Sequence, residues 1–249
     1  MGHKKLIRFE AIKNFPNVFQ YPTGMAGKWK DHFGNENPIT LELACGKGEY
    51  TVGLSALYPD RNFIGVDVKG NRIYVGAKKC LDQQQHNAAF LRTKIDQITD
   101  YFAPGEVEEI WLTFPDPQLR RSRHTKRLTH PKFLRKYQQF MKPGGLIHLK
   151  TDSPVLYRFT MWMVEMYQLD LVEQTDNLYE QPKISPELSI KTHYEGLDIA
   201  GSNRIHYICF RLPSTPLADR DREIHDMVFE YETPTDQTEE QIRQEQAGQ

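Results

Sequence analysis

Carboxylate side chains accompany the strand-like segments of this sequence at regular places. Five of them lie within or directly after a short apolar segment: Glu42, Asp67, Asp96, Asp116 and Asp152. The carboxyl ends of parallel strands meet at one edge of a sheet, and ligands bind in the crevice outside that edge. We therefore expect these acids to converge on one binding site.

A glycine turn follows the first of these segments. In the stretch ELACGKG (residues 42–48), Gly46 and Gly48 let the backbone approach a ligand closely because they have no side chain. The G-x-G-x-x-G pattern of dinucleotide-binding turns is incomplete here, since Ala44 stands in the first glycine position. A turn with a purely structural role is the alternative interpretation.

The negative charge of the expected site helps to distinguish between two candidate cofactors, a dinucleotide and S-adenosylmethionine. A dinucleotide needs a turn that cradles its diphosphate, whereas S-adenosylmethionine has no phosphate and carries a sulfonium and an ammonium group, which favour carboxylates. Asp67 lies 19 residues after Gly48, where an acid can accept from both hydroxyls of a ribose, and Asp96 is placed to meet an adenine amino group. Capping of the next helix (Asp67) and an ordinary turn (Asp96) are the alternatives. We expect a class I methyltransferase whose S-adenosylmethionine has these contacts: Glu42, Gly46, Gly48, Asp67, Asp96 and Asp116.

The stretch TFPDPQLRRSRHTKRL (residues 113–128) joins a constrained carboxylate to a dense block of positive charge. Prolines on both sides of Asp116 restrict the backbone that carries it. Residues 120–136, called the basic stretch below, contain eight lysines and arginines and no acid. Such a run is most often a solvated surface, but this one begins four residues after a carboxylate at the expected ligand edge. We expect the following side chains to bind nucleic-acid phosphates: Arg121, Arg123, Lys126 and Arg127.

The elements that must hold these groups alternate between strand and helix. Strand patterns cover residues 39–44, 62–68, 87–96, 108–114, 146–152, 169–175 and 204–212. Helix patterns lie between them: one ends before Pro59, one covers residues 70–85, one runs from about Pro131 to a Gly-Gly stop at 144–145, and one covers 153–168. This alternation predicts an α/β fold, Rossmann-like, with a mostly parallel seven-stranded sheet and helices on both faces.

Composition narrows the class of protein further. The 249 residues, 39% of them hydrophobic, favour one large domain over two small ones. No apolar run is long enough for a signal peptide or a transmembrane helix, and the three cysteines lack C-x-x-C spacing, so we expect a cytoplasmic protein. The nine histidines show no paired-ligand spacing, so we expect no metal site.

The net charge of −1 hides an uneven distribution. Residues 218–249 carry ten acidic and three basic side chains, which leaves a charge of +6 on residues 1–217. A basic body favours a polyanionic partner. We expect an N-terminal extension at residues 1–37, a methyltransferase domain at residues 38–217, and an acidic, partly disordered tail at residues 218–249.

Five stretches in this order carry a resemblance to a known family: LELACGKG, GVDVKGNRI, TFPDPQLRRSRHTKRL, LKTD and IKTHYEGLDIAG. Together they resemble the bacterial tRNA (guanine-N(7)-)-methyltransferase family over residues 38–212. The resemblance implies S-adenosylmethionine as the methyl donor and tRNA as the partner. It also implies the acceptor, a guanine at position 46 in the variable loop.

The resemblance further implies roles for single residues. Glu42, Asp67, Asp96 and Asp116 would contact the cofactor, and Asp116 would also belong to the catalytic centre. The substrate contacts would be Arg120, Asp152, Thr192, His193, Tyr194 and Glu195. Four positions depart from the family's usual residues: Ala44 (commonly glycine), Gln118 (an aromatic), Arg120 (lysine) and His193 (lysine).

Two other functions are compatible with parts of the sequence. The FPDP stretch has a faint similarity to the DPPY-type motif of exocyclic-amine methyltransferases, but Gln118 follows where that motif has a second proline and a stacking aromatic. An inactive RNA-binding scaffold is the other alternative, and the intact acids at the strand ends disfavour it. A monomer and a homodimer are both compatible with the sequence.

Overall fold

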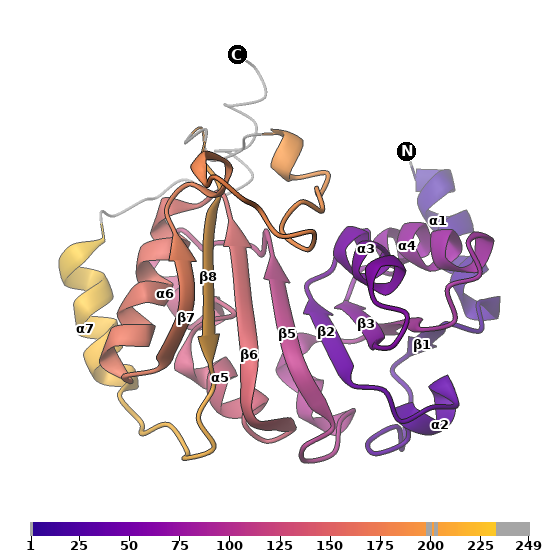
Figure 1. Ribbon diagram of the computed structural model, residues 1–249, viewed down its shortest axis with the longest axis horizontal. Helices are drawn as coiled ribbons and strands as arrows, with labels where there is room; N and C mark the ends of the chain where they lie inside the picture. Colours follow the sequence, from indigo (N-terminus) through magenta and orange to yellow (C-terminus); the bar gives the residue numbers. More distant parts are fainter. Residues whose placement is uncertain (1, 198–200, 202–203, 233–249) are drawn as a thin grey trace.

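The protein forms one eight-stranded sheet, shown face-on in Figure 1. The computed structural model describes residues 2–197, 201 and 204–232. Across the sheet the strands follow the order β1 (Val18–Gln20), β4 (Ala88–Arg92), β3 (Asn62–Asp67), β2 (Ile39–Leu43), β5 (Val107–Thr113), β6 (Met141–Thr151), β8 (His206–Arg211) and β7 (Asp170–Thr175). Neighbouring strands from β1 to β6 are parallel, and β8 is antiparallel to both β6 and β7. The predicted mostly parallel α/β sheet is confirmed, with eight strands instead of seven.

The eighth strand comes from the segment expected to be an N-terminal extension. β1 pairs with β4 at the edge of the sheet, and helix α1 (Gly2–Ala11) packs against α4 (Gly70–Asp82). Trp29, in the short helix α2 (Trp29–Phe33), is fully buried and stacks on Phe102 at 5.5 Å between ring centroids. The described residues before 38 are therefore part of the folded body.

Both faces of the sheet are covered. Alternate side chains of the strands point to opposite faces, so Ile110 belongs to the core cluster with α5 (Pro131–Tyr137) and α6 (Pro154–Met166). Trp111 belongs to the core cluster with α3 (Glu49–Leu57). Short 3-10 turns complete the described elements: η1 (Ile12–Asn14), η2 (Ile95–Asp100), η3 (Arg121–Lys126), η4 (Leu178–Glu180) and η5 (Glu195–Leu197).

The direction in which the chain travels across the sheet reverses between β2 and β5. From β2 the chain continues to β3 and β4 on one side, and from β5 it continues to β6 on the other. The connections that follow β2 and β5 therefore leave a crevice at their carboxyl ends, which is where such sheets bind ligands.

One helix prediction was wrong at its end. α5 stops at Tyr137, and the Gly-Gly pair lies inside β6 instead of terminating the helix. Glycine is required there by the neighbouring strand: a Cβ on Gly145 would lie 2.8 Å from the carbonyl oxygen of Glu108. Gly145 thus allows β6 to approach β5 closely.

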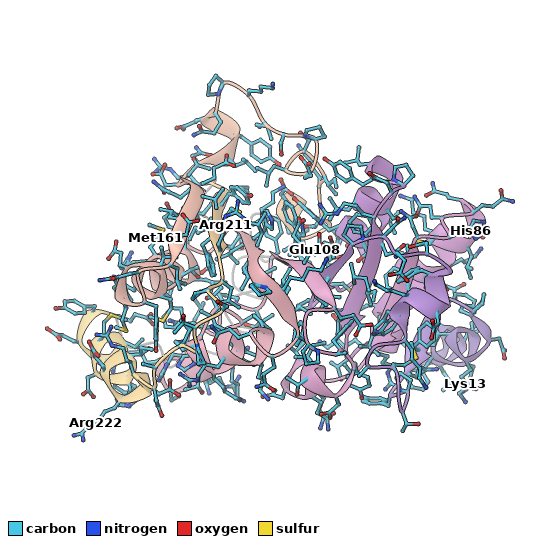
Figure 2. All side chains as sticks on the ribbon, turned by 60° about the horizontal axis from the view of Figure 1, so that its bottom comes forward. Lys13, His86, Glu108, Met161, Arg211 and Arg222 are labelled. Carbon is cyan, nitrogen blue, oxygen red and sulfur yellow. The ribbon has the colours of Figure 1, made fainter. Side chains whose placement is uncertain are left out.

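Part of the acidic C-terminal segment is a helix, α7 (Asp221–Tyr231). Ile224 and Val228 of α7 are fully buried against Phe159 and Met163 of α6. Figure 1 shows α7 beside α6 at one end of the molecule, and Figure 2 shows Arg222 of α7 projecting from that end. Residues 233–249, where much of the expected disordered tail lies, are outside the described residues. Within the parts that the structure describes, every helix is too short or too polar to cross a membrane.

Candidate active site

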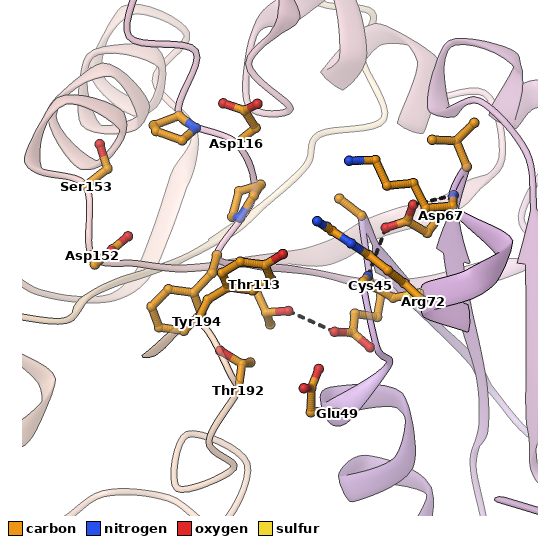
Figure 3. A pocket seen from close by; sticks show the side chains of 18 of the residues that line it. Cys45, Glu49, Asp67, Arg72, Thr113, Asp116, Asp152, Ser153, Thr192 and Tyr194 are labelled. Carbon is orange, nitrogen blue, oxygen red and sulfur yellow. Dashed lines mark hydrogen bonds between the residues drawn. The ribbon is translucent and has the colours of Figure 1, made fainter. Parts of the chain in front are cut away.

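A cavity of about 460 Å³ opens at the carboxyl ends of β2, β3, β5 and β6 (Figure 3). This volume lies within the usual range for small-molecule sites, roughly 300–1,000 Å³. Its lining includes five carboxylates and two cationic side chains: Glu42, Glu49, Asp67, Asp116, Asp152, Lys69 and Arg72. The excess of carboxylates suits a positively charged ligand such as S-adenosylmethionine.

The turn after β2 forms the floor of the cavity. Ala44, Gly46 and Gly48 all have positive φ angles (58°, 56° and 72°). A side chain costs about 1–2 kcal/mol in this left-handed region, so Ala44 is strained where the family commonly has glycine. Gly46 lines the cavity, whereas Gly48 is needed for packing, since a Cβ there would lie 2.5 Å from the Phe90 ring.

Glu42 is buried beneath this turn, with 3% of its surface exposed. One carboxylate oxygen accepts hydrogen bonds from the Thr51 amide (2.8 Å) and hydroxyl (2.6 Å), and the other accepts from the Thr113 hydroxyl (2.9 Å). Burial raises the pKa of Glu42 to about 7, although the Thr51 and Thr113 hydrogen bonds oppose this shift. Glu42 therefore ties β2, α3 and β5 together and changes its charge near neutral pH.

Asp67 ends β3 and points toward the same turn (Figure 3). One of its carboxylate oxygens accepts from the Gly46 amide at 2.9 Å and the other from the Lys69 amide at 2.8 Å. Each oxygen has a second lone pair, and Asp67 lines the cavity. The carboxylate thus fixes the glycine turn and can still accept from a ligand hydroxyl.

Asp116 lies at the mouth of the cavity, in the connection between β5 and η3. Its side chain is exposed, and one carboxylate oxygen accepts from the Gln118 amide at 3.1 Å. Phe114 and Gln118, which bracket the Pro-Asp-Pro sequence, have positive φ angles of 48° and 49°. Residues 114–118, called the Asp116 loop below, are thus a strained turn that places Asp116 in the cavity lining.

Asp96 is not among the residues that line the cavity. It lies on η2, where its carboxylate, 60% exposed, forms an ion pair with Lys132 at 2.8 Å. The structure therefore brings four of the five expected acids together around the cavity and leaves Asp96 at a lysine of the basic stretch. The adenine contact expected for Asp96 stays a prediction.

The THYE sequence near the C-terminal part of the domain forms a capping box. The Thr192 hydroxyl accepts from the Glu195 amide (3.2 Å), and the Glu195 carboxylate accepts from the Thr192 amide (3.4 Å). Thr192 and Tyr194 line the cavity, and the Arg72 guanidinium lies over the Tyr194 ring at 5.7 Å. His193 is exposed and lies outside the lining. The segment thus closes one side of the cavity with two of its four residues.

Lys150, which the sequence reasoning missed, holds this segment in place. Its side chain is fully buried, and its ammonium group contacts the Leu188 carbonyl (2.8 Å), the Ile190 carbonyl (3.1 Å) and the Glu195 carboxylate (3.0 Å). Burial lowers the pKa of Lys150, and Glu195 opposes the shift. The sequence feature that could have identified Lys150 is its position in the LKTD motif, at the end of β6 and two residues before Asp152.

Some cations of the basic stretch are exposed to solvent, and others bind groups of the protein. Arg123 and Lys126 are exposed, and no carboxylate of the described residues is paired with them. Arg121 donates to the Phe229 carbonyl of α7 at 2.9 Å. The prediction that Arg127 contacts phosphate was wrong. Its side chain is fully buried and forms an ion pair with Glu232, so a phosphate cannot reach it.

The remaining predicted residues lie near the opening. Asp152 lines the cavity and directly precedes Ser153, whose hydroxyl accepts from the Leu156 amide (3.2 Å) and caps α6. Arg120 is half-buried outside the cavity lining and precedes η3. In the part of the chain that the structure describes, no group of three or more histidine, cysteine or acidic side chains could hold a metal ion.

Solved structures share this architecture. The 16S rRNA methyltransferase KamB has a TM-score of 0.56 and 13% identity, over 75% of this chain and 93% of that chain. The aminoglycoside resistance methyltransferase NpmB1 has a TM-score of 0.52 and 15% identity, over 77% and 95%. The fold is that of a class I methyltransferase.

Sequence comparison identifies the family. The model of a family described as "Putative methyltransferase" matches residues 36–206. The tRNA (guanine-N(7)-)-methyltransferase of Bacteroides thetaiotaomicron is 48% identical, over 86% of this chain and 87% of that protein. The protein of the same name from Bacillus subtilis is 34% identical, over 78% and 90%. The chain belongs to the tRNA (guanine-N(7)-)-methyltransferase family, and the predicted family, enzyme class and methyl donor, S-adenosylmethionine, are confirmed.

Proposed function

We propose that this protein transfers a methyl group from S-adenosylmethionine to N7 of the guanine at position 46 of tRNA, in the cytoplasm. The observation that carries the proposal is the acidic cavity at the switch point of the sheet, which opens beside the basic stretch. The first feature suits a cationic methyl donor, and the second suits a phosphate backbone. Family membership supplies the acceptor.

The residues of the cavity fit the methyl donor. Asp67 would accept hydrogen bonds from the ribose hydroxyls, since it lines the cavity and each of its oxygens keeps a lone pair beyond its hydrogen bond to the turn. Glu42 and Glu49 would oppose the positive charges, and the backbone at Gly46 allows close approach. S-adenosylmethionine supplies the methyl group on its sulfonium centre. Asp96 would complete the adenine end if its carboxylate left Lys132.

The acceptor atom determines what Asp116 has to do. Guanine N7 carries an in-plane lone pair, so no general base must remove a proton before the attack. Alignment of the reacting atoms can supply about 7–11 kcal/mol. The methylated base gains the positive charge that the sulfonium loses, and the Asp116 carboxylate at the cavity mouth would stay close to a cation throughout. Asp116 therefore acts as an orienting and electrostatic group.

The tRNA would approach over the exposed part of η3. Arg123 and Lys126 would contact phosphates, with Arg120 closer to the base. Asp152, Thr192 and Tyr194 line the cavity opposite the glycine turn, where the base has to enter. Because N7 faces the major-groove edge, tertiary pairing in folded tRNA can occupy it. We expect local opening of the variable loop.

A tRNA transcript that contains 7-deazaguanine tests the acceptor atom. Carbon replaces N7 in this base, while its shape, stacking and Watson–Crick edge are nearly kept. Binding should weaken only by the lost N7 hydrogen bonds, about 0.5–1.5 kcal/mol each, and labelled methyl transfer should cease. An exocyclic-amine methyltransferase would still turn over on this transcript, and that result would replace the N7 assignment. An inactive scaffold would bind tRNA and show no heat of S-adenosylmethionine binding in calorimetry.

A further inference from the structure

The buried Arg127 connects two distant parts of the chain. Its guanidinium forms two hydrogen bonds with the Glu232 carboxylate, at 2.5 and 2.8 Å, and lies over the Phe159 ring at 4.6 Å. The Glu232 side chain is only 7% exposed. The forked geometry is the strong, directional form of an arginine–carboxylate pair. Glu232 also lies beyond residues 36–206, which match the family model.

The same guanidinium holds the backbone of the Asp116 loop. Nε donates to the Pro117 carbonyl and Nη2 to the Gln118 carbonyl, both at 3.2 Å. Gln118 is the residue whose amide binds the Asp116 carboxylate. Four hydrogen bonds therefore lead from Glu232 through Arg127 to the two residues that follow Asp116.

The Asp116 loop needs such an external support. Phe114 and Gln118 both adopt positive φ angles without being glycine. Strained residues of this kind persist only where the surrounding structure fixes them. The two carbonyls that Arg127 binds follow directly after Asp116, so a change at Arg127 alters the direction of this carboxylate.

Contacts at both ends and along one face of helix α7 fix the position of Glu232, which directly follows the helix. At its first turn, Asp221 binds Arg135 through both carboxylate oxygens at 2.9 Å. At its end, the Phe229 carbonyl accepts from Arg121. Ile224 and Val228 pack on α6 between these points. The helix therefore spans the basic stretch and delivers one buried carboxylate beside the loop.

We propose that Glu232 and Arg127 are positioning residues for methyl transfer. Glu232 neutralises and orients the buried Arg127, and Arg127 fixes the Asp116 loop so that Asp116 faces the cavity. The proposal rests on the proposed function for the role of Asp116. It gives Glu232, in the acidic segment 218–249, a positioning role at the site, and it replaces the phosphate contact expected for Arg127.

Glu232→Gln is the primary variant, because it removes the charge and keeps the shape. Arg127→Lys keeps the charge and removes the fork. Two variants serve as controls: Glu230→Gln removes a charge from an exposed position of α7, and deletion of residues 236–249 removes acidic charge while keeping Glu232. Hydrogen–deuterium exchange of peptides from residues 114–127 reports the loop directly, with peptides from β3 as a reference for global unfolding.

Both variants should exchange faster over residues 114–127 with β3 unchanged, and both controls should match the wild type. Turnover at saturating tRNA and cofactor should fall by about tenfold to a hundredfold, since misplacement of a reacting group by about 1 Å can cost about a hundredfold. Affinities for tRNA and S-adenosylmethionine should stay nearly constant. In an Asp116→Asn background, Glu232→Gln should cause no further loss, since it acts through Asp116.

Unchanged exchange in Glu232→Gln, or an equal loss of turnover with and without the Asp116 carboxylate, would overturn the positioning role. If Arg127→Lys fails to fold, Glu232→Gln still decides the question. Absence of methyl transfer to tRNA by the wild type would instead contradict the proposed function, and the exchange comparison would still show whether the pair holds the loop.

Discussion

The two walls of the cavity are built in different ways. The wall proposed to bind the cofactor, called the cofactor wall below, is held by contacts among strand ends and the first turn of α3: Asp67 binds the turn at Gly46, and Glu42 binds Thr51 and Thr113. The wall proposed to bind the substrate, called the substrate wall below, is held by single buried cations that bind loops and the C-terminal segment. Lys150 reaches Glu195, 45 residues away, and Arg127 reaches Glu232, 105 residues away.

Because of this difference, we expect the two walls to respond differently to substitutions. Sheet register fixes the cofactor wall, so its residues can be read from strand ends and glycine spacing. The loops of the substrate wall depend on single buried cations, and removing one partner of a buried ion pair costs roughly 3–5 kcal/mol. We expect substitutions at these cations to disable tRNA methylation while cofactor binding survives.

Lys150→Met should have the largest effect on stability. It leaves the Glu195 carboxylate buried without its cation, which should lower the free energy of unfolding by about 3–5 kcal/mol. Below the unfolding temperature, tRNA binding should weaken while S-adenosylmethionine binding changes little. Denaturant unfolding and two calorimetric titrations measure this, with the exposed Lys191→Met as the matched control. Equal losses of both affinities would show that the two walls are not independent.

Asp116→Asn should reduce turnover by about a hundredfold, equivalent to about 2.7 kcal/mol of transition-state stabilisation. The substitution keeps the shape and removes the charge that faces the methylated base. Fold and tRNA affinity should persist, as thermal unfolding and a binding titration would check. If the variant turns over as fast as the wild type, Asp116 has only a structural role in the turn.

Asp67→Ala should weaken S-adenosylmethionine binding by about 1–3 kcal/mol, because two ribose hydroxyls lose a charged acceptor. Binding of tRNA should remain close to that of the wild type, the reverse of the pattern for Lys150→Met. Calorimetry with each ligand tests the pair of variants. An unchanged cofactor affinity would refute the ribose assignment.

The raised pKa of Glu42 makes cofactor binding depend on pH. Between the ordinary value of 4.5 and about 7 the folded protein keeps a proton that the unfolded chain has lost. The resulting stabilisation is complete below pH 4.5 and is lost as the pH rises through 7. A cation prefers the carboxylate, so S-adenosylmethionine affinity should increase about tenfold from pH 5.5 to 7. Glu42→Gln should flatten this profile in calorimetry, and a profile that keeps its slope would assign the titration to another group.

Replacing Arg123 and Lys126 with alanine should have the smallest effect. Each lost phosphate contact should reduce the slope of log affinity against log salt by about one unit, alike for different tRNAs. Turnover at saturating tRNA should hardly change. Filter binding at several salt concentrations measures the slope, and an unchanged slope would identify η3 as an ordinary solvated surface.

The sequence predicts the cofactor wall better than the substrate wall for a physical reason. Strand patterns and their terminal acids placed Glu42 and Asp67 at one edge, because parallel strands end together, whereas Asp96 lies outside the cavity lining. β1 was missed, since three residues are too few to show an alternation. Arg127 was assigned to phosphate because charge patterns cannot reveal a buried partner more than a hundred residues away. Lys150 was missed because a charge pattern also cannot show its burial or its pairing with Glu195, 45 residues away.

The most direct test of the central claim is to identify the methylated nucleoside. Purified protein is incubated with S-adenosylmethionine and an unmodified tRNA transcript, and the digested nucleosides are analysed by mass spectrometry. A second transcript carries adenine in place of guanine 46. We expect 7-methylguanosine in the first transcript and none in the second. Methylation of another base or atom, or equal 7-methylguanosine in both transcripts, would contradict the account.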